Sequence, residues 1–117
     1  MPSQRRVYRV AEKIRNLVAL ELNKVADPRF SLVTISSVMV SPDLRYAKVY
    51  WMVSGGKERI AEVEEAFQSA QGLFKRLLAK ELGVRFVPEL RFFYDDTLDT
   101  CEEVERLIAR IHSEPKT

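Results

Sequence analysis

Cysteine, histidine and glycine are all scarce in this 117-residue chain, which holds one cysteine, one histidine and four glycines. A lone cysteine, Cys101, excludes an intramolecular disulfide and a cysteine-based metal site, which fits a reducing compartment. The only histidine, His112, stands near the C-terminus, where no serine or cysteine arrangement for nucleophilic catalysis is credible. The chain also lacks a Walker-type phosphate loop. We therefore expect neither an enzyme nor a bound cofactor.

Long apolar runs are missing as well, so no segment is long enough to cross a bilayer. The N-terminal stretch MPSQRRVYRV is basic, but no apolar segment and no small-residue cleavage site follow it. We predict a cytoplasmic protein with no membrane contact. Asp95, Asp96 and Asp99 could in principle hold a divalent cation, yet their spacing lacks the glycine and terminal glutamate of an EF-hand. Helix-start acids are the simpler interpretation, and we expect no metal site.

The length suits one domain, and the periodicity of apolar residues predicts an α+β fold. The expected elements, in chain order, are a helix over 3–25, a β-hairpin with strands 30–41 and 44–53, a helical segment over 57–82, a strand over 85–94 and a last short helix. Pro88 should confine the third strand to an edge of the sheet. For the last helix, Thr100 and Glu103 have the spacing of a capping box.

The helical segment over 57–82 contains a glycine, Gly72, at a position where the apolar periodicity runs on without a break. Glycine in a helix interior costs about 1 kcal/mol relative to alanine. A straight helix of this length would run roughly 39 Å, whereas a domain of this size has a radius of gyration of about 13 Å. A bend at Gly72 would let both halves pack on one sheet. The alternative is a continuous helix that tolerates its glycine.

Basic residues gather in the first half of the chain. Residues 1–50 hold nine Lys and Arg against four Asp and Glu, a net charge of +5, while residues 51–117 hold ten against thirteen, a net charge of −3. Arg5, Arg9 and Lys13 follow one another at i, i+4 spacing, where like charges repel by a few tenths of a kcal/mol per pair. Arg76 and Lys80 repeat that spacing after the glycine. Such strain indicates a surface for an anionic partner, although a merely solvated face has the same pattern.

Two further surfaces have more than one interpretation. Tyr46 and Tyr50 lie beside Lys48 on one face of the second strand, where they could stack on unpaired bases or pack against the added C-terminal helix. The apolar residues of that last helix could close the core, and its role is left open; they are Val104, Leu107, Ile108 and Ile111.

Four motifs in the expected order resemble the ribosome-binding factor A family over about residues 5–96. They are DPR at 27–29, VMVSPDLRYAKVYW at 38–51, AQG at 70–72 and VRFVPELRFFYDD at 84–96. The resemblance implies a type II KH-like domain of order α-β-β-α-kink-α-β, followed here by a C-terminal helix. In ordinary KH domains a GxxG loop clamps the nucleic-acid backbone. This chain has no GxxG and carries Ala70-Gln71-Gly72 in its place, with the glycine expected to permit the bend.

The resemblance further implies a non-enzymatic assembly factor. It would bind free 30S small ribosomal subunits and assist late maturation of 16S ribosomal RNA, including its 5′ end, especially in the cold. It would also overlap in function with the GTPase Era and be released by another assembly GTPase. We expect a monomer in which residues 1–96 form the ribosome- and RNA-binding domain and residues 97–117 an amphipathic helix with a frayed tail.

Within that domain, we predict that exposed cations hold phosphates of the rRNA; these are Arg5, Arg6, Arg9, Lys13, Lys75, Arg76, Lys80 and Arg85. Two other functions fit the same residues. A protein-interaction adaptor would dock a partner on its sheet face or last helix, with the basic face only solvated. A general KH-type binder would prefer single-stranded RNA, but the missing GxxG counts against it.

Overall fold

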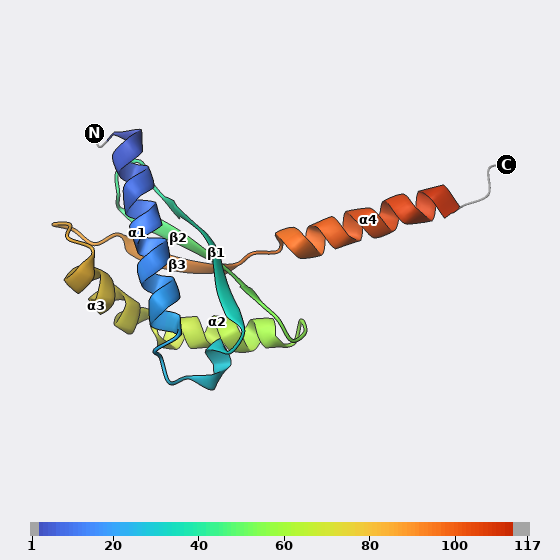
Figure 1. The fold of residues 1–117 in the computed structure, drawn as a ribbon, viewed down its shortest axis with the longest axis horizontal. Coiled ribbons are helices and arrows are strands. Elements are labelled where there is room, and N and C mark those ends of the chain that lie inside the picture. The colour runs from blue at the N-terminus through green and yellow to red at the C-terminus, as the bar shows by residue number, and fades with distance from the viewer. Residues whose placement is uncertain (1–2, 114–117) are drawn as a thin grey trace.

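The computed structural model describes residues 3–113 as a three-stranded sheet covered on one face by helices, with one further helix that projects from the sheet (Figure 1). Its elements in chain order are α1 (Gln4–Leu22), a 3₁₀ turn (Pro28–Phe30), β1 (Val33–Val40), β2 (Tyr46–Val53), α2 (Arg59–Ser69), α3 (Gln71–Glu81), β3 (Glu89–Tyr94) and α4 (Thr97–Ser113). The order α-β-β-α-α-β-α is the α+β order expected from the sequence.

The sheet has the strand order β1-β2-β3 and is mixed. β2 pairs antiparallel with β1 and parallel with β3, so the two edges are β1 and β3, as Pro88 predicted for the third strand. Alternation along β2 buries Ala47, Val49 and Trp51 on the helix-covered face and turns Tyr46 and Lys48 to the open face.

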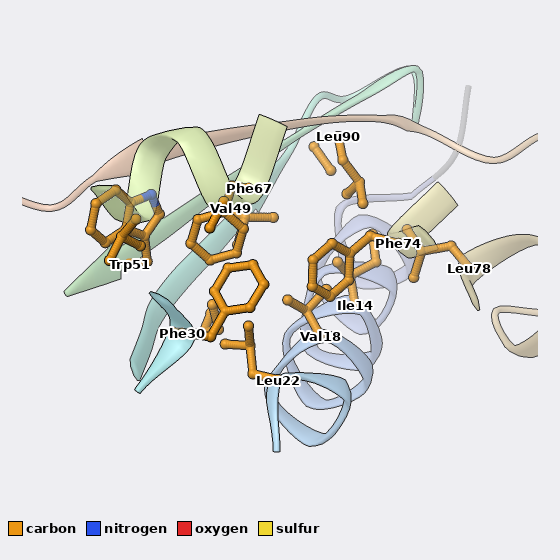
Figure 2. Packing of buried hydrophobic residues seen from close by; sticks show 14 of the residues in the cluster. Ile14, Val18, Leu22, Phe30, Val49, Trp51, Phe67, Phe74, Leu78 and Leu90 are labelled. Atoms are coloured by element: carbon orange, nitrogen blue, oxygen red, sulfur yellow. The ribbon is translucent and has the colours of Figure 1, made fainter. Parts of the chain in front are cut away.

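The core lies between that sheet face and the first three helices (Figure 2). α1 contributes a stripe at four-residue spacing, Val10, Ile14, Val18 and Leu22. Phe67 of α2 stacks on Phe92 of β3, with ring centroids 4.5 Å apart. Phe74 and Leu78 of α3 are fully buried beside them. Burial of a side chain of this size contributes about 1.5–3 kcal/mol, so α1, α2 and α3 are all held to the sheet.

The central helix is interrupted, as predicted, and the continuous-helix alternative is wrong. α2 ends at Ser69, Ala70 has φ −92° and ψ 4°, and α3 begins at Gln71. The bend turns Phe67 of α2 and Phe74 of α3 into the same core, with ring centroids 6.1 Å apart. One straight helix could not present both halves to so small a sheet.

Several element boundaries differ from those expected. α1 ends at Leu22, three residues earlier than predicted, and β3 begins at Glu89, after Pro88. Proline has no N–H to donate to a strand ladder, which explains the later start of β3. The capping box at Thr100 and Glu103 is wrong, because α4 begins at Thr97 and both residues lie inside it.

The expectation that the last helix could close the core is wrong for α4. None of its residues is buried, and its apolar residues are exposed by about half or more: Leu98, Val104, Leu107, Ile108 and Ile111. The Cα radius of gyration is 17.8 Å, against about 13 Å for a compact chain of this size. The excess reflects the projection of α4 (Figure 1). The predicted tail falls mostly on residues 114–117, outside the described residues. No helix within residues 3–113 has the length and apolar character of a membrane span.

Candidate nucleic-acid interface

The predicted basic residues of α1 are exposed at its surface: Arg5 and Arg9 lie away from the stripe that packs on the sheet, whereas Arg6 continues the spacing of that stripe one turn before Val10. Arg5, Arg6, Arg9 and Lys13 are all exposed, and they extend from the first turn of α1 to its middle. The apolar spacing that buries Val10 and Ile14 turns Arg5, Arg9 and Lys13 outward, and Arg6 is exposed beyond the end of the buried stripe. The helix that supplies the core also fixes a row of positive charge.

The second group of basic residues comes from α3 and the loop after it. Lys75, Arg76, Lys80 and Arg85 are all exposed. α3 packs beside α1, and Lys13 Nζ of α1 donates to the carbonyl oxygen of Leu82, 3.1 Å away, at the C-terminal end of α3. The fold thus places two sequence-distant basic clusters on neighbouring helices. We call the exposed cations of α1, α3 and Arg85 the basic face.

No residue of the basic face has an acidic partner within 4.0 Å among residues 3–113. Other arginines of the same stretch do form ion pairs; they are Arg15, Arg29, Arg45, Arg59 and Arg91. The tightest of these joins Arg29 to Asp27 at 2.7 Å, and the guanidinium lowers the pKa of that carboxyl from its ordinary value. The basic face therefore keeps its positive charge available for a partner.

The helix ends add to this positive field. α1 is capped by Ser3 Oγ, which accepts from the N–H of Arg6 at 3.2 Å, and its first turn holds no acidic residue. The first turn of α3 has neither an acidic residue nor a side-chain cap. A helix N-terminus carries about half a positive charge, so each of the two helices adds a positive end to its own basic residues. This arrangement disfavours the isolated helices and suits an anion.

The break between α2 and α3 is held by Gln71, whose Nε2 donates to the carbonyl oxygen of Leu90 in β3 at 2.6 Å. This contact fixes the start of α3 against the edge strand. Gly72 lies inside α3 and its φ is not in the left-handed region, so the bend, at Ala70, does not use glycine's conformational freedom. A Cβ at Gly72 would lie 3.3 Å from a guanidinium nitrogen of Arg76. The glycine instead gives that guanidinium room over the helix.

Tyr46 and Tyr50 lie on the open face of the sheet, and Tyr46 lines a hollow together with Lys75 of the basic face. The guanidinium of Arg91 lies 5.2 Å from the ring centroid of Tyr46, and the Tyr50 ring lies 5.8 Å from that of Phe93. α4 buries none of its residues, so the alternative in which these tyrosines pack against the added helix is not what the structure has. Their stacking on bases stays a prediction.

The acidic residues after β3 anchor α4. Asp95 accepts from the hydroxyl of Ser36 at 2.7 Å and from the hydroxyl and N–H of Thr97, bonds that lower its pKa from the ordinary value. Asp99 accepts from the Tyr94 hydroxyl at 2.5 Å, which raises the pKa of Tyr94 to about 12. Among residues 3–113, no group of three potential ligands could hold a metal ion. These contacts give Asp95 and Asp99 a structural role at the start of α4.

A groove at the end of the basic face was not predicted from the sequence. Its volume is about 530 Å³, and it lies between the N-terminal half of α1, the β1–β2 turn and the loop before β3. Arg6 and Arg85 of the basic face line it together with Arg45 and Phe86. The ring of Phe86 is 76 % exposed. Only its position before Pro88, outside the strand, could have indicated that this phenylalanine avoids the core.

Comparison with known proteins gives one consistent result. The family model described as ribosome-binding factor A matches residues 6–108. A ribosome-binding factor A from Desulfatibacillum aliphaticivorans is 43% identical over 112 residues, 95% of this chain and 91% of the relative.

A solved structure and a model fitted into a cryo-EM map share the fold. The solution NMR structure of a Thermotoga maritima protein assigned to ribosome binding factor A has a TM-score of 0.69 and 35% identity, over 80% of this chain and 90% of that one. A homology model of ribosome binding factor A from Thermus thermophilus, fitted into a cryo-EM map of a complex with the 30S subunit, has a TM-score of 0.62 and 25% identity, over 73% of this chain and 90% of that one. The fold is the type II KH-like fold of these structures.

Proposed function

The chain belongs to the ribosome-binding factor A family, and we propose that it binds the free 30S small subunit and assists late maturation of 16S rRNA. The family consists of ribosome assembly factors that are not enzymes. The Thermus thermophilus member is known in complex with the 30S subunit. A small domain of this kind would act by occupying a site on the rRNA rather than by chemistry.

The observation that carries the proposal is the basic face. Its eight cations are exposed and have no acidic partner within residues 3–113. Repulsion between like charges at i, i+4 spacing destabilises a helix by a few tenths of a kcal/mol per pair. Phosphates of folded rRNA would remove that repulsion, and each contact would release counterions.

The proposed contacts position the protein and do not read sequence, because lysine and arginine meet phosphates that every nucleotide carries. Gln71 holds α3 against β3, and Lys13 links the end of α3 to α1. The two basic helices therefore meet the rRNA as one rigid surface. We propose that residues 1–96 form this ribosome- and RNA-binding domain and that residues 97–117 are a separate appendage, described here up to residue 113.

The finer parts of the proposal concern the cell. A 30S-bound monomer would work in the cytoplasm, assist 5′-end processing of 16S rRNA and matter most in the cold, when rRNA structures rearrange slowly. Functional overlap with the GTPase Era and release by another assembly GTPase belong to the same proposal. These parts rest on the family and not on a contact in the fold.

A protein-interaction adaptor is the second candidate function, favoured by α4. The apolar residues of this helix are exposed by about half or more, as Leu107 at 50% and Ile111 at 70% illustrate. Such a stripe is typical of a helix that docks in an apolar groove. An adaptor that acts only through α4 would not need the basic face.

Co-sedimentation distinguishes the two functions. Purified protein would be pelleted with isolated small subunits, large subunits or whole ribosomes, and compared with a variant in which Arg9, Lys13, Arg76 and Lys80 are all changed to glutamate. We expect pelleting with free small subunits only, and its loss in the variant. Fluorescence of the buried Trp51 would verify that the variant folds.

Salt gives the second criterion. With six or more phosphate contacts, affinity should fall by about a thousandfold or more between about 50 and 200 mM salt. Binding that does not change with salt, or that survives the four reversals, would reject the basic face as the site. Pelleting with every particle would favour a general RNA binder, and pelleting with none would reject the proposed function.

A further inference from the structure

The groove between α1, the β1–β2 turn and the loop before β3 has the composition of a nucleotide site. We propose that it holds one unpaired nucleotide of RNA, with the base stacked on Phe86 and the adjoining phosphate held by Arg6. The inference rests on the proposed function, because the RNA would be the rRNA that the basic face contacts.

The ring of Phe86 is placed for stacking. It is 76 % exposed, more than any other large apolar side chain in the described chain. The guanidinium of Arg85 lies 5.3 Å from its centroid, within the range of a cation–π contact. Arg85 thus supports one side of the ring and leaves the other open. Burial of Phe86 by a base would explain why an apolar ring is held at the surface.

The floor of the groove is apolar, since Val10 and Leu44 line it, and its volume of about 530 Å³ is typical of small-ligand sites. Leu44 has a positive φ of 61°, in the left-handed region that disfavours a non-glycine residue. Its N–H donates to the carbonyl oxygen of Ser41 at 2.9 Å, which closes the β1–β2 turn. The turn therefore brings Leu44 and Arg45 to the groove in a fixed arrangement.

The charged residues that line the groove favour an anionic ligand. Three arginines and one acid, Asp43, line the groove. Asp43 is already engaged: it accepts from Ser41 Oγ at 2.7 Å and lies 3.8 Å from Arg45 Nε. Arg6 and Arg85 have no acidic partner among residues 3–113. An apolar floor, an open aromatic ring and unpaired guanidinium groups suit an unpaired nucleotide, whose base stacks while its phosphates pair.

The groove is continuous with the basic face through Arg6, one turn before Val10 on α1. A strand of RNA whose phosphates lie along Arg9 and Lys13 would reach the groove at the N-terminal end of α1. Double-stranded RNA could not use Phe86, because its bases are stacked within the helix.

The test uses the full chain and a nine-nucleotide single-stranded RNA that carries one 2-aminopurine, whose fluorescence falls when the base stacks. The variant Phe86→Ala removes the ring, and Phe86→Trp keeps an aromatic surface. Phe93→Ala is the matched control, because Phe93 is 41% exposed on the open sheet face, outside the groove. We expect quenching with the natural protein, with Phe86→Trp and with Phe93→Ala, and at least about fivefold weaker binding with Phe86→Ala.

Three results would overturn the nucleotide site. The first is no quenching with the natural protein, and the second is an equal loss of affinity in Phe86→Ala and Phe93→Ala. The third is that Phe86→Ala weakens binding to a duplex RNA of the same sequence as much as binding to the single strand. Co-sedimentation of the natural protein with 30S subunits separates this failure from that of the proposed function. If the natural protein pellets with small subunits but shows no quenching, the ribosomal function stands and the nucleotide site falls.

Discussion

α1 and α4 are both amphipathic helices of similar length, yet the fold uses them in opposite ways. α1 buries Val10, Ile14, Val18 and Leu22 against the sheet, whereas α4 buries none of its residues. α1 carries five basic and two acidic residues, and α4 carries two basic and four acidic ones. Apolar periodicity thus predicts a helix but not a packing partner. The charge on each helix indicates which end of the molecule an anionic RNA can approach.

The largest difference between the two regions should appear in stability. Leu78→Ala removes a fully buried side chain from α3, whereas Leu107→Ala removes one that is 50% exposed on α4. We expect the first change to lower the free energy of unfolding by about 2–5 kcal/mol and the second to alter it by less than about 0.5 kcal/mol. Urea unfolding, followed by the fluorescence of Trp51, measures both. Comparable losses in the two variants would mean that α4 packs on the body of the protein.

Matched charge reversals on the basic face and on α4 should have different effects on 30S affinity. Arg9 and Arg76 lie on the basic face, and Arg106 and Arg110 lie on α4. Changing either pair to glutamate alters the charge equally, but only the first pair would meet phosphates. We expect at least about a tenfold loss of 30S affinity for Arg9→Glu with Arg76→Glu, and less than about twofold for the α4 pair. Equal losses would show that net charge, and not a defined face, drives binding.

Gly72 tests whether the basic face depends on a glycine. Its φ is not in the left-handed region, so Gly72→Ala should keep the bend and stabilise α3 by up to about 1 kcal/mol, as urea unfolding would measure. Gly55→Ala is the control, because Gly55 has φ +110° and a Cβ there would lie 3.0 Å from Arg59 Cδ. That change should destabilise the protein. Destabilisation by Gly72→Ala of more than about 1 kcal/mol would show that the bend requires the glycine.

The smallest effect concerns Asp95, which joins the body to α4. Hydrogen bonds from Thr97 and Ser36 lower its pKa, so the folded state favours the carboxylate. The stability that this provides is fully present above the ordinary pKa of about 3.9 and is lost as the pH falls through the lowered value. Below about pH 4, the melting temperature of the natural protein should therefore fall more steeply with decreasing pH than that of Asp95→Asn, as thermal unfolding would measure. Parallel pH profiles for the two proteins would exclude this contribution.

The sequence predicted the body of the protein better than its C-terminal helix and the loop before β3, for a physical reason. The stripe of α1, the interruption near Gly72 and the edge position of β3 each depend on local rules of periodicity, helix length and proline chemistry. The position of α4 depends on whether a free apolar surface exists for it, which no local pattern encodes. Arg85 and Phe86 were wrongly assigned to the third strand, because their alternation continues that of β3. They lie in the loop before β3, since Pro88 cannot donate to the strand ladder.

For the candidate site as well, the local features could be predicted from the sequence and the tertiary ones could not. The spacing of Arg5, Arg9 and Lys13 indicated an exposed row, and all eight predicted cations are exposed. The proximity of α1 to α3, and with it the joining of the two clusters, required the tertiary fold. So did the groove at Phe86, because its walls come from three segments far apart in the chain.

Tethered hydroxyl-radical probing tests most directly which region faces the rRNA. An iron–EDTA group would be attached either to the natural Cys101 on α4, which is exposed, or to a cysteine at the exposed Ala79 on α3, introduced as Ala79→Cys in a Cys101→Ser background. With each labelled protein bound to 30S subunits, we predict strong, localised cleavage of 16S rRNA from position 79 and weak or no cleavage from position 101. Strong cleavage from position 101 with none from position 79 would contradict the basic face as the rRNA interface.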